Sequence, residues 1–218
     1  FLGEPVPEAI ISVPAYFNDN QRNAPRVAAK LAGLKVERLI NEPTAAAIAY
    51  GVREESDEMN FIVVDLGGGT FDVSVMEKFD DLLEVQASAG DSELGGEDFT
   101  QALVEHILQQ NALSWQVLSL QERGRMYRQV DGVKAVLSEK ESAEFVFTVN
   151  EREYTGQVTQ AELASVWGSL LKRLTLPVER ALRDASLTHS DISHVFMVGG
   201  ATRMPQVQQL MTRILRRF

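Results

Sequence analysis

Cysteine is absent from the 218 residues of this chain. A disulfide framework, a thiolate nucleophile and a thiolate metal site are therefore all excluded. No apolar run reaches the ~20 residues that a helix needs to cross a bilayer, and the first residues lack a signal-peptide pattern. We therefore expect no membrane partner, and a cytoplasmic location. The chain begins with Phe1 instead of Met, which favours a processed chain or a piece of a longer protein.

Basic residues are scarce in one stretch. Residues 51–100 contain fourteen acidic and only two basic side chains, a net charge of −12, so the remaining residues carry +2 of the total of −10. Proteins bind nucleic acid by neutralising phosphates with Lys and Arg, so nucleic acid is not the expected partner. Near the C-terminus, we interpret the arginine cluster as a solvated helix face. It consists of Arg203, Arg213, Arg216 and Arg217.

The residues that are present are those of an ordinary globular protein, with 44% hydrophobic and 24% charged side chains. Periodicity predicts three blocks. Residues 1–52 form an α/β block, residues 53–94 and 171–218 form a second α/β block, and residues 95–170 form a helical block with a β-hairpin. Within the first block we expect strands at Glu8–Val13 and Val36–Ile40, and helices at Asn18–Leu31 and Pro43–Tyr50. We interpret Arg53–Asn60 as a connection between lobes.

The other two blocks are predicted in the same way. In the second block, we expect strands at 61–64, 71–75, Leu83–Ala87 and His194–Val198, a turn at Gly90-Asp91, and a helix from Pro205 to near Arg217. In the third, we expect helices at Phe99–Gln109 and Leu120–Leu137, and hairpin strands at Phe145–Val149 and Glu153–Thr155. A capping box at Thr159 opens a long helix, in which Pro177 predicts a kink or break.

The segment Asp65-Leu66-Gly67-Gly68-Gly69-Thr70-Phe71-Asp72 joins two of these strands and is the most informative stretch of the chain. Three successive residues without Cβ let backbone N–H groups converge on phosphate oxygens. Asp65 would repel a phosphate unless a cation lay between them, which indicates Mg²⁺ held through water. No Gly-Lys-Ser/Thr follows and no helix follows, so this is neither a Walker A loop nor a dinucleotide fingerprint. The alternative is a glycine-rich hairpin with two solvated aspartates.

A second glycine element runs from Met197 to Pro205 and leads from a strand into a helix. Gly199 and Gly200 would let a flat ring lie against the backbone, and the planar guanidinium of Arg203 could stack on that ring. These features fit an adenine site. The alternative is a plain strand-to-helix turn that only reverses the chain.

Together these segments resemble the nucleotide-binding domain of the DnaK-like heat-shock chaperones of the seventy-kilodalton class. That family belongs to the actin and sugar-kinase superfamily. Five segments in the family's order carry the resemblance: Ile11–Asp19, Ile40–Ala47, Asp65–Asp72, Ala89–Phe99 and Val198–Pro205. The resemblance implies an actin-like, ribonuclease-H-like α/β ATPase fold, with one nearly complete lobe and half of the other. The divergence of residues 111–158 suggests a specialised member that is similar to the Hsc-type bacterial chaperones, rather than a housekeeping one.

The resemblance also implies the residues of the site. Gly67, Gly68, Gly69 and Thr70 would hold the phosphates of ATP or ADP, and Asp65 would hold Mg²⁺ through water. Glu42 would position or activate the hydrolytic water, with Thr70 near the γ-phosphate and Asp72 supporting the network. The adenosine side would use Asp131, Lys134, Ser138, Gly199, Gly200 and Arg203. Pro14 and Arg22 resemble a pair that relays nucleotide state to the client-binding domain.

Three positions depart from the family's pattern: Asp131 stands for a usual Glu, Ala135 for a second basic residue and Ala201 for a common Ser. Gly132 in mid-helix also costs roughly 1 kcal/mol relative to Ala. We therefore expect weaker contacts to base and ribose.

The family's first phosphate loop, an Asp-Leu-Gly-Thr-Thr segment, does not occur in this sequence. The resemblance therefore implies an ATP-hydrolysing chaperone as the parent protein, and a piece that binds nucleotide weakly and hydrolyses it negligibly. The implied partners are client proteins, a J-domain co-chaperone and a nucleotide-exchange factor. Two alternatives are a sugar kinase of the same superfamily and a non-catalytic module in which residues 95–170 dock a co-chaperone or exchange factor.

Overall fold

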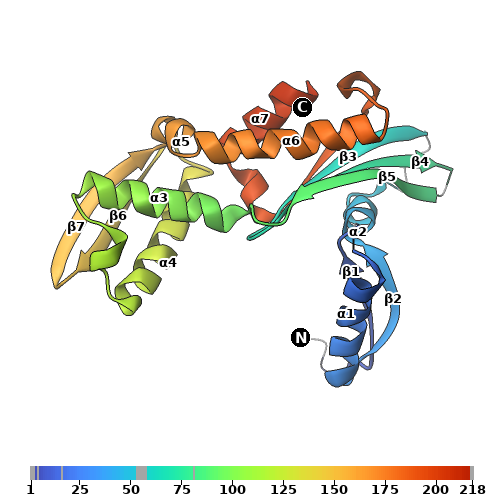
Figure 1. Ribbon diagram of the computed structural model, residues 1–218, viewed down its shortest axis with the longest axis horizontal. Coiled ribbons are helices and arrows are strands. Elements are labelled where there is room, and N and C mark those ends of the chain that lie inside the picture. Colours follow the sequence, from blue (N-terminus) through green and yellow to red (C-terminus); the bar gives the residue numbers. More distant parts are fainter. Residues whose placement is uncertain (1–2, 4, 16, 53–57, 81, 217–218) are drawn as a thin grey trace. The chain divides into compact units, whose positions relative to one another are not determined.

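The computed structural model describes residues 3, 5–15, 17–52, 58–80 and 82–216 (Figure 1). Its chain divides into two compact units, one containing residues 1–64, 73–89 and 180–196 and the other residues 65–72, 90–179 and 197–218. Each unit contains both helices and strands, which confirms the predicted α/β class. The division into three blocks stays a prediction. Within the described residues, no helix combines the length and apolar character that a membrane span requires.

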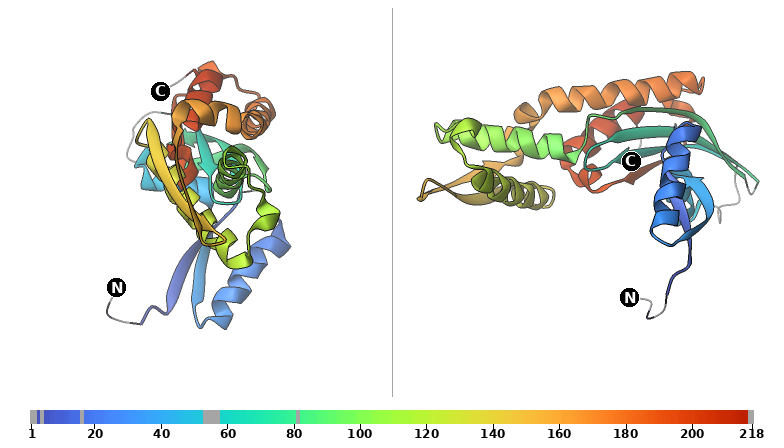
Figure 2. Two further views of the ribbon diagram at one scale, coloured as in Figure 1. Left: turned by 90° about the vertical axis from the view of Figure 1, so that its left-hand side faces the viewer. Right: turned by 60° about the horizontal axis from the view of Figure 1, so that its bottom comes forward.

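The first unit begins with a β-α-β arrangement. Strands β1 (Glu8–Val13) and β2 (Lys35–Asn41) pair in parallel, and helix α1 (Asp19–Leu31) connects them (Figure 2). Asn18 caps α1, because its side-chain oxygen accepts a bond of 3.0 Å from the amide of Gln21, whose side chain accepts one in return. Helix α2 (Glu42–Ala49) follows β2 directly. These four elements confirm the predicted order.

The largest sheet has four strands in the order β5-β4-β3-β8. Its strands are β3 (Met59–Leu66), β4 (Phe71–Phe79), β5 (Leu82–Asp91) and β8 (His194–Val198). Strand β3 has neighbours on both sides, and four successive residues, 61–64, are buried, which explains its continuous apolar run. The predicted turn at Gly90-Asp91 is wrong, because β5 continues through both residues. There the strand overrides the turn preference of Gly and Asp.

The second unit contains the predicted helical block. Helices α3 (Gly96–Gln110) and α4 (Leu120–Leu137) pack against each other, and the antiparallel hairpin of β6 (Ser142–Val149) and β7 (Arg152–Thr159) packs against α4 (Figure 1). Asn150 and Glu151 both have positive φ, 48° and 64°, as a two-residue hairpin turn requires. The predicted hairpin is therefore confirmed, with longer strands.

Two successive helices, α5 (Gln160–Val166) and α6 (Gly168–Asp184), follow the capping box of Thr159. The helix breaks at Trp167, and α6 continues through Pro177. Of the kink or break predicted at that proline, the break is therefore wrong and the kink stays a prediction. Trp167 is fully buried, and its indole N–H donates a bond of 3.0 Å to the carbonyl oxygen of Phe99 in α3. This bond and the packing of the indole hold the chain at the junction of α5 and α6.

Short 3-10 turns and one further helix complete the described chain. The turns η2 (Trp115–Val117) and η3 (His189–Asp191) lie in connections, and η4 (Gly200–Arg203) precedes helix α7 (Pro205–Leu215). Arg216 ends α7 with φ of 54°. Arg217 and residues 53–57 of the expected connection lie outside the described residues.

Candidate nucleotide site

Residues 67–70 form the loop between β3 and β4, which we call the phosphate loop, and the start of α3 orients it. The amides of Gly96 and Glu97 donate bonds of 2.8 Å to the carbonyl oxygens of Gly67 and Gly68. In a planar trans peptide, the C=O and the following N–H point in opposite directions. The N–H groups of Gly68 and Gly69 therefore point away from α3, toward the side where an anion can approach.

Close backbone packing makes this arrangement depend on glycine. A Cβ atom on Gly95 would overlap the carbonyl oxygen of Gly68 and the amide nitrogen of Gly69. The amide of Gly95 donates a bond of 2.8 Å to the Asp98 carboxylate, which closes the first turn of α3. The positive end of the α3 dipole thus lies directly behind the loop and favours an anion in front of it.

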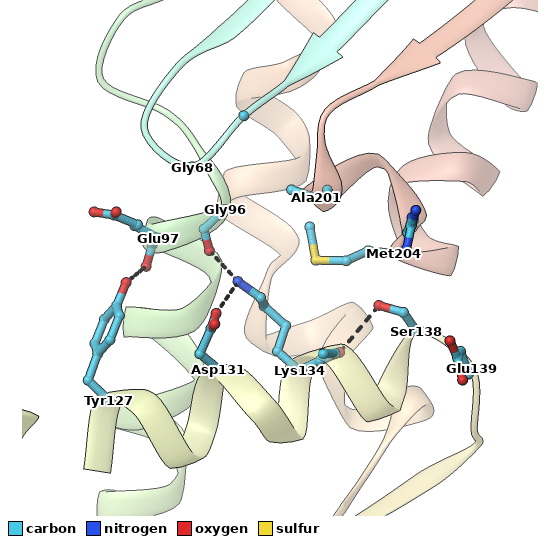
Figure 3. A pocket seen from close by; sticks show the side chains of 14 residues that line it. Gly68, Gly96, Glu97, Tyr127, Asp131, Lys134, Ser138, Glu139, Ala201 and Met204 are labelled. Carbon is cyan, nitrogen blue, oxygen red and sulfur yellow. Dashed lines mark hydrogen bonds and ion pairs between the residues drawn. The ribbon is translucent and has the colours of Figure 1, made fainter. Parts of the chain in front are cut away.

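Helix α4 reaches the start of α3 through a charged network (Figure 3). The ammonium of Lys134 donates bonds of 2.8 Å to the carbonyl oxygen of Gly96 and 2.6 Å to the hydroxyl oxygen of Thr100. It also forms an ion pair of 2.8 Å with Asp131, whose Oδ1 accepts a bond of 2.9 Å from Thr100. The bond from Lys134 is the main reason that the pKa of Asp131 lies below its ordinary value.

The end of β8 forms the wall facing α4. Gly199 has φ of 87°, and a Cβ atom there would overlap the carbonyl oxygen of Leu66 at the end of β3. Only glycine fits that position. A Cβ on Gly200, in contrast, would meet nothing within 4 Å, so the backbone of Gly200 is open to a ligand.

These walls enclose a pocket of about 500 Å³ within the second unit (Figure 3). Seven predicted site residues line it: Gly67, Gly68, Asp131, Lys134, Ser138, Gly200 and Arg203. The other lining residues, which were not predicted as site residues, are Gly96, Glu97, Tyr127, Ala135, Glu139, Ala201 and Met204. Tyr127 lies one helical turn before Asp131, so the period of α4 could have identified it.

Asp65 has the environment of a carboxylate that would gain from a cation. It lies between the buried residues Val64 and Leu66 of β3, and burial raises its pKa above the ordinary value. No described residue is recorded as a hydrogen-bond or ion-pair partner of this side chain. The described residues contain no group of three or more metal-ligating side chains. A hydrated Mg²⁺, which borrows few protein ligands, fits this donor set.

The remaining predicted residues are placed as follows. Gly69 and Thr70 are exposed at the tip of the loop, where the carbonyl of Thr70 accepts a bond of 3.0 Å from the amide of Gly67. Asp72 follows at the start of β4 and lies against the backbone of Gly90 in β5. Glu42 is the first residue of α2 and belongs to the first unit.

Pro14 and Arg22 meet in one turn of the first unit. The amide of Phe17 donates a bond of 3.2 Å to the Pro14 carbonyl oxygen. The guanidinium of Arg22 donates bonds of 2.9 Å to the carbonyl oxygens of Ala15 and Phe17 and to the side chain of Asn41. Arg22 therefore fixes the backbone that follows Pro14 and ties it to the end of β2.

The mixed α/β fold and its loop-bordered pocket fit the actin-like class of folds. Residues 1–217 match the family model described as Hsp70 protein, and this chain belongs to that family. The match decides against the sugar-kinase alternative. The Hsc-type resemblance of residues 111–158 stays a prediction.

Curated relatives agree with this result. The chain is 42% identical to chaperone protein dnaK3 of Thermosynechococcus vestitus over the whole chain and 33% of the relative. It is 41% identical to chaperone protein dnaK of Guillardia theta, with 36% of the relative covered, and 41% identical to chaperone protein DnaK 1 of a Synechococcus species, with 30% covered. Each alignment includes the whole of this chain. The chain thus spans about a third of the length of these relatives.

Proposed function

We propose that this chain is part of the ATP-binding and ATP-hydrolysing domain of a DnaK-like chaperone, and that its pocket binds ATP or ADP with Mg²⁺. The carbonyl oxygens of Gly67 and Gly68 are bonded to the start of α3, which leaves the N–H groups of Gly68 and Gly69 for phosphate oxygens. This orientation is the observation that carries the proposal. A generic glycine hairpin would not need it.

The other pocket residues take the remaining parts of the nucleotide. Asp65 holds the hydrated Mg²⁺ near the phosphates, while Asp131 and Lys134 face the ribose. The base lies toward Ser138, with the backbone of Gly199 and Gly200 on one side and Arg203 stacked on its ring. Ala135 carries no positive charge, so only one face of the base is held by a cation, the guanidinium of Arg203.

Hydrolysis requires positioning and charge stabilisation around the γ-phosphate. Glu42 orients the attacking water, Thr70 places its hydroxyl near the γ-phosphate, and Asp72 supports the network of water and metal. The family's Asp-Leu-Gly-Thr-Thr loop does not occur in the sequence, so the phosphate loop holds the phosphates from one side only. The chain therefore binds nucleotide weakly and turns it over slowly by itself.

The wider role follows from the relatives, whose names are those of chaperones. Nucleotide state in the parent protein controls the binding of client proteins, with a J-domain co-chaperone and a nucleotide-exchange factor as partners. The Pro14 and Arg22 turn passes that state to the client-binding domain. The parent protein acts in the cytoplasm.

Calorimetric titration of Mg-ADP into the chain tests the proposed site. Lys134→Met removes the ammonium that bridges Gly96 and Asp131, leaving a carboxylate that repels phosphate, so affinity should fall at least tenfold. Lys140→Met is the matched control, because Lys140 follows α4 and does not line the pocket. Equal affinity of wild type and both variants, or no binding by the wild type, would reject the proposed site.

A further inference from the structure

Tyr127 lines the pocket one helical turn before Asp131 and has no part in the proposed function. It is one of the lining residues, and its side chain rises from α4 toward the first turn of α3 (Figure 3). The phenol O–H donates a bond of 3.2 Å to the carbonyl oxygen of Glu97. That bond ties the ring to the first turn of α3, where Glu97 also borders the pocket.

The phenol oxygen keeps acceptor capacity after this bond. A tyrosine hydroxyl donates one proton and can accept further bonds through its lone pairs. Burial, followed by the neighbouring Glu97 carboxylate, raises the pKa of Tyr127 above its ordinary value. The group therefore stays protonated at neutral pH, with its proton directed to Glu97. The hydroxyl of Thr100 also lies within hydrogen-bond reach of the phenol oxygen, which leaves one lone pair for a further donor.

Asp131 offers a second acceptor one helical turn further along α4. Its Oδ1 is taken by Lys134 and Thr100, while no described residue is recorded as a partner of Oδ2. The side chain of Asp131 is 56% exposed, so that oxygen is accessible from the pocket. Residues four apart on a helix lie side by side on one face.

Two neighbouring acceptors require two neighbouring donors. The carboxylates of Glu97 and Asp131 flank Tyr127, so a phosphate would be repelled there and a neutral group with O–H donors would be favoured. Tyr127 and Ser138 are eleven residues apart, about 16 Å along a helix. This length accommodates a nucleoside diphosphate with its sugar between the loop and the base.

Resting on the proposed function, we propose that Tyr127 is a specificity-determining residue for the sugar of the nucleotide: its phenol oxygen and Asp131 Oδ2 together accept the vicinal hydroxyls of ribose. The shorter Asp131 reaches less far than a glutamate would. The phenol oxygen of Tyr127 supplies a second acceptor, which compensates for the shorter reach of the Asp131 carboxylate.

Titrations with Mg-ADP and with Mg-2′,3′-dideoxy-ADP test this role, up to millimolar ligand. The ratio of the two affinities measures discrimination by the sugar hydroxyls within one protein, independently of any general loss of stability. We expect the wild type to prefer ADP at least tenfold. Tyr127→Phe keeps the ring and removes the oxygen, and should reduce this preference about three- to tenfold while leaving the affinity for the dideoxy nucleotide unchanged.

Tyr154→Phe is the matched control, because Tyr154 lies in β7, stacks on Phe147 and does not line the pocket. It should keep the wild-type ratio. If the wild type and Tyr127→Phe discriminate equally while both bind ADP, the role of Tyr127 is rejected and the nucleotide site stands. If the wild type binds neither nucleotide, both proposals fall.

Discussion

The amide of Gly96 donates a bond of 2.8 Å to the carbonyl oxygen of Gly67, and this bond decides which side of the phosphate loop presents N–H groups. A three-glycine turn by itself could present either side, because glycine adopts many backbone conformations. Here α3 selects one of them. The site thus depends on a residue pair separated by 29 positions in the sequence.

Gly95→Ala should disrupt this orientation. Its methyl group would overlap the backbone of Gly68 and Gly69, and neither can move without breaking the bonds from α3. We expect a loss of about 1–3 kcal/mol in the free energy of unfolding, as for overpacked sites, together with loss of Mg-ADP binding. Urea unfolding followed by circular dichroism measures the first and calorimetry the second. Unchanged ADP affinity would contradict the proposed orientation.

Gly132→Ala is the matched control for Gly95→Ala, because the space that its methyl group would fill is open. A Cβ there meets nothing within 4 Å, and the residue lies in mid-helix in α4. We expect a gain of about 0.5–1 kcal/mol, since alanine loses less backbone entropy in a helix. Urea unfolding should show a higher midpoint with the same slope. A loss of stability would mean that α4 needs the freedom of glycine at this position.

Trp167→Phe should destabilise the second unit by about 1–3 kcal/mol. The substitution removes the bond to Phe99 and part of the ring that packs edge-on against the ring of Phe99 at 5.4 Å. Trp115→Phe is the control, because Trp115 is only half-buried and its ring contacts the guanidinium of Arg123. Thermal unfolding compares them. Equal losses in both variants would argue against Trp167 as the central contact.

Glu122 predicts a pH dependence of stability. Bonds from the hydroxyl and amide of Ser119 and from the amide of Asn150 lower its pKa to about 2. Because the folded-state pKa is below the ordinary value, its stabilisation is complete above about pH 4.5 and is lost as the pH falls toward 2. Glu122→Gln should therefore lower the free energy of unfolding at neutral pH and reduce its further loss as the pH falls toward 2. Urea unfolding at several pH values measures both effects. The same loss of stability at low pH in wild type and variant would contradict these bonds.

Asp65→Asn should stabilise the ligand-free chain and weaken its response to Mg²⁺. Burial raises the pKa of Asp65, so the carboxylate lowers folding stability as the pH rises through and above its ordinary value. Asparagine removes that charge. Melting temperatures at neutral pH should rise slightly without ligand and should increase less with Mg-ADP than in the wild type. A lower melting temperature without ligand would contradict the unpaired state of Asp65.

Much of the fold could be predicted because local signals agree with the final packing. The helix that begins near Asn18, the capping residue Thr159 and the strand at His194–Val198 lie where the sequence places them. The predicted element boundaries were wrong where contacts between residues distant in the sequence determine the structure. Pairing with β4 extends β5 through Gly90, where a turn was predicted. The long helix is interrupted at the buried Trp167 and continues through Pro177, where a kink or break was predicted.

The candidate site shows the same division. The glycine loop and the residues at Asp131 and Lys134 were identified from motifs and from the family. Glu97, Tyr127 and Met204 were missed, because they line the pocket only after α3, α4 and η4 come together. No local pattern marks Glu97 or Met204, whereas the helical period of α4 marks Tyr127, one turn before Asp131. The docking role of residues 95–170 stays a prediction.

The phosphate loop is held in its orientation by protein bonds alone. A ligand that enters the pocket therefore finds its donors already arranged and loses little loop entropy on binding. Such preorganisation favours fast association with small rearrangement, so the occupancy of this loop should follow changes in nucleotide concentration with little delay.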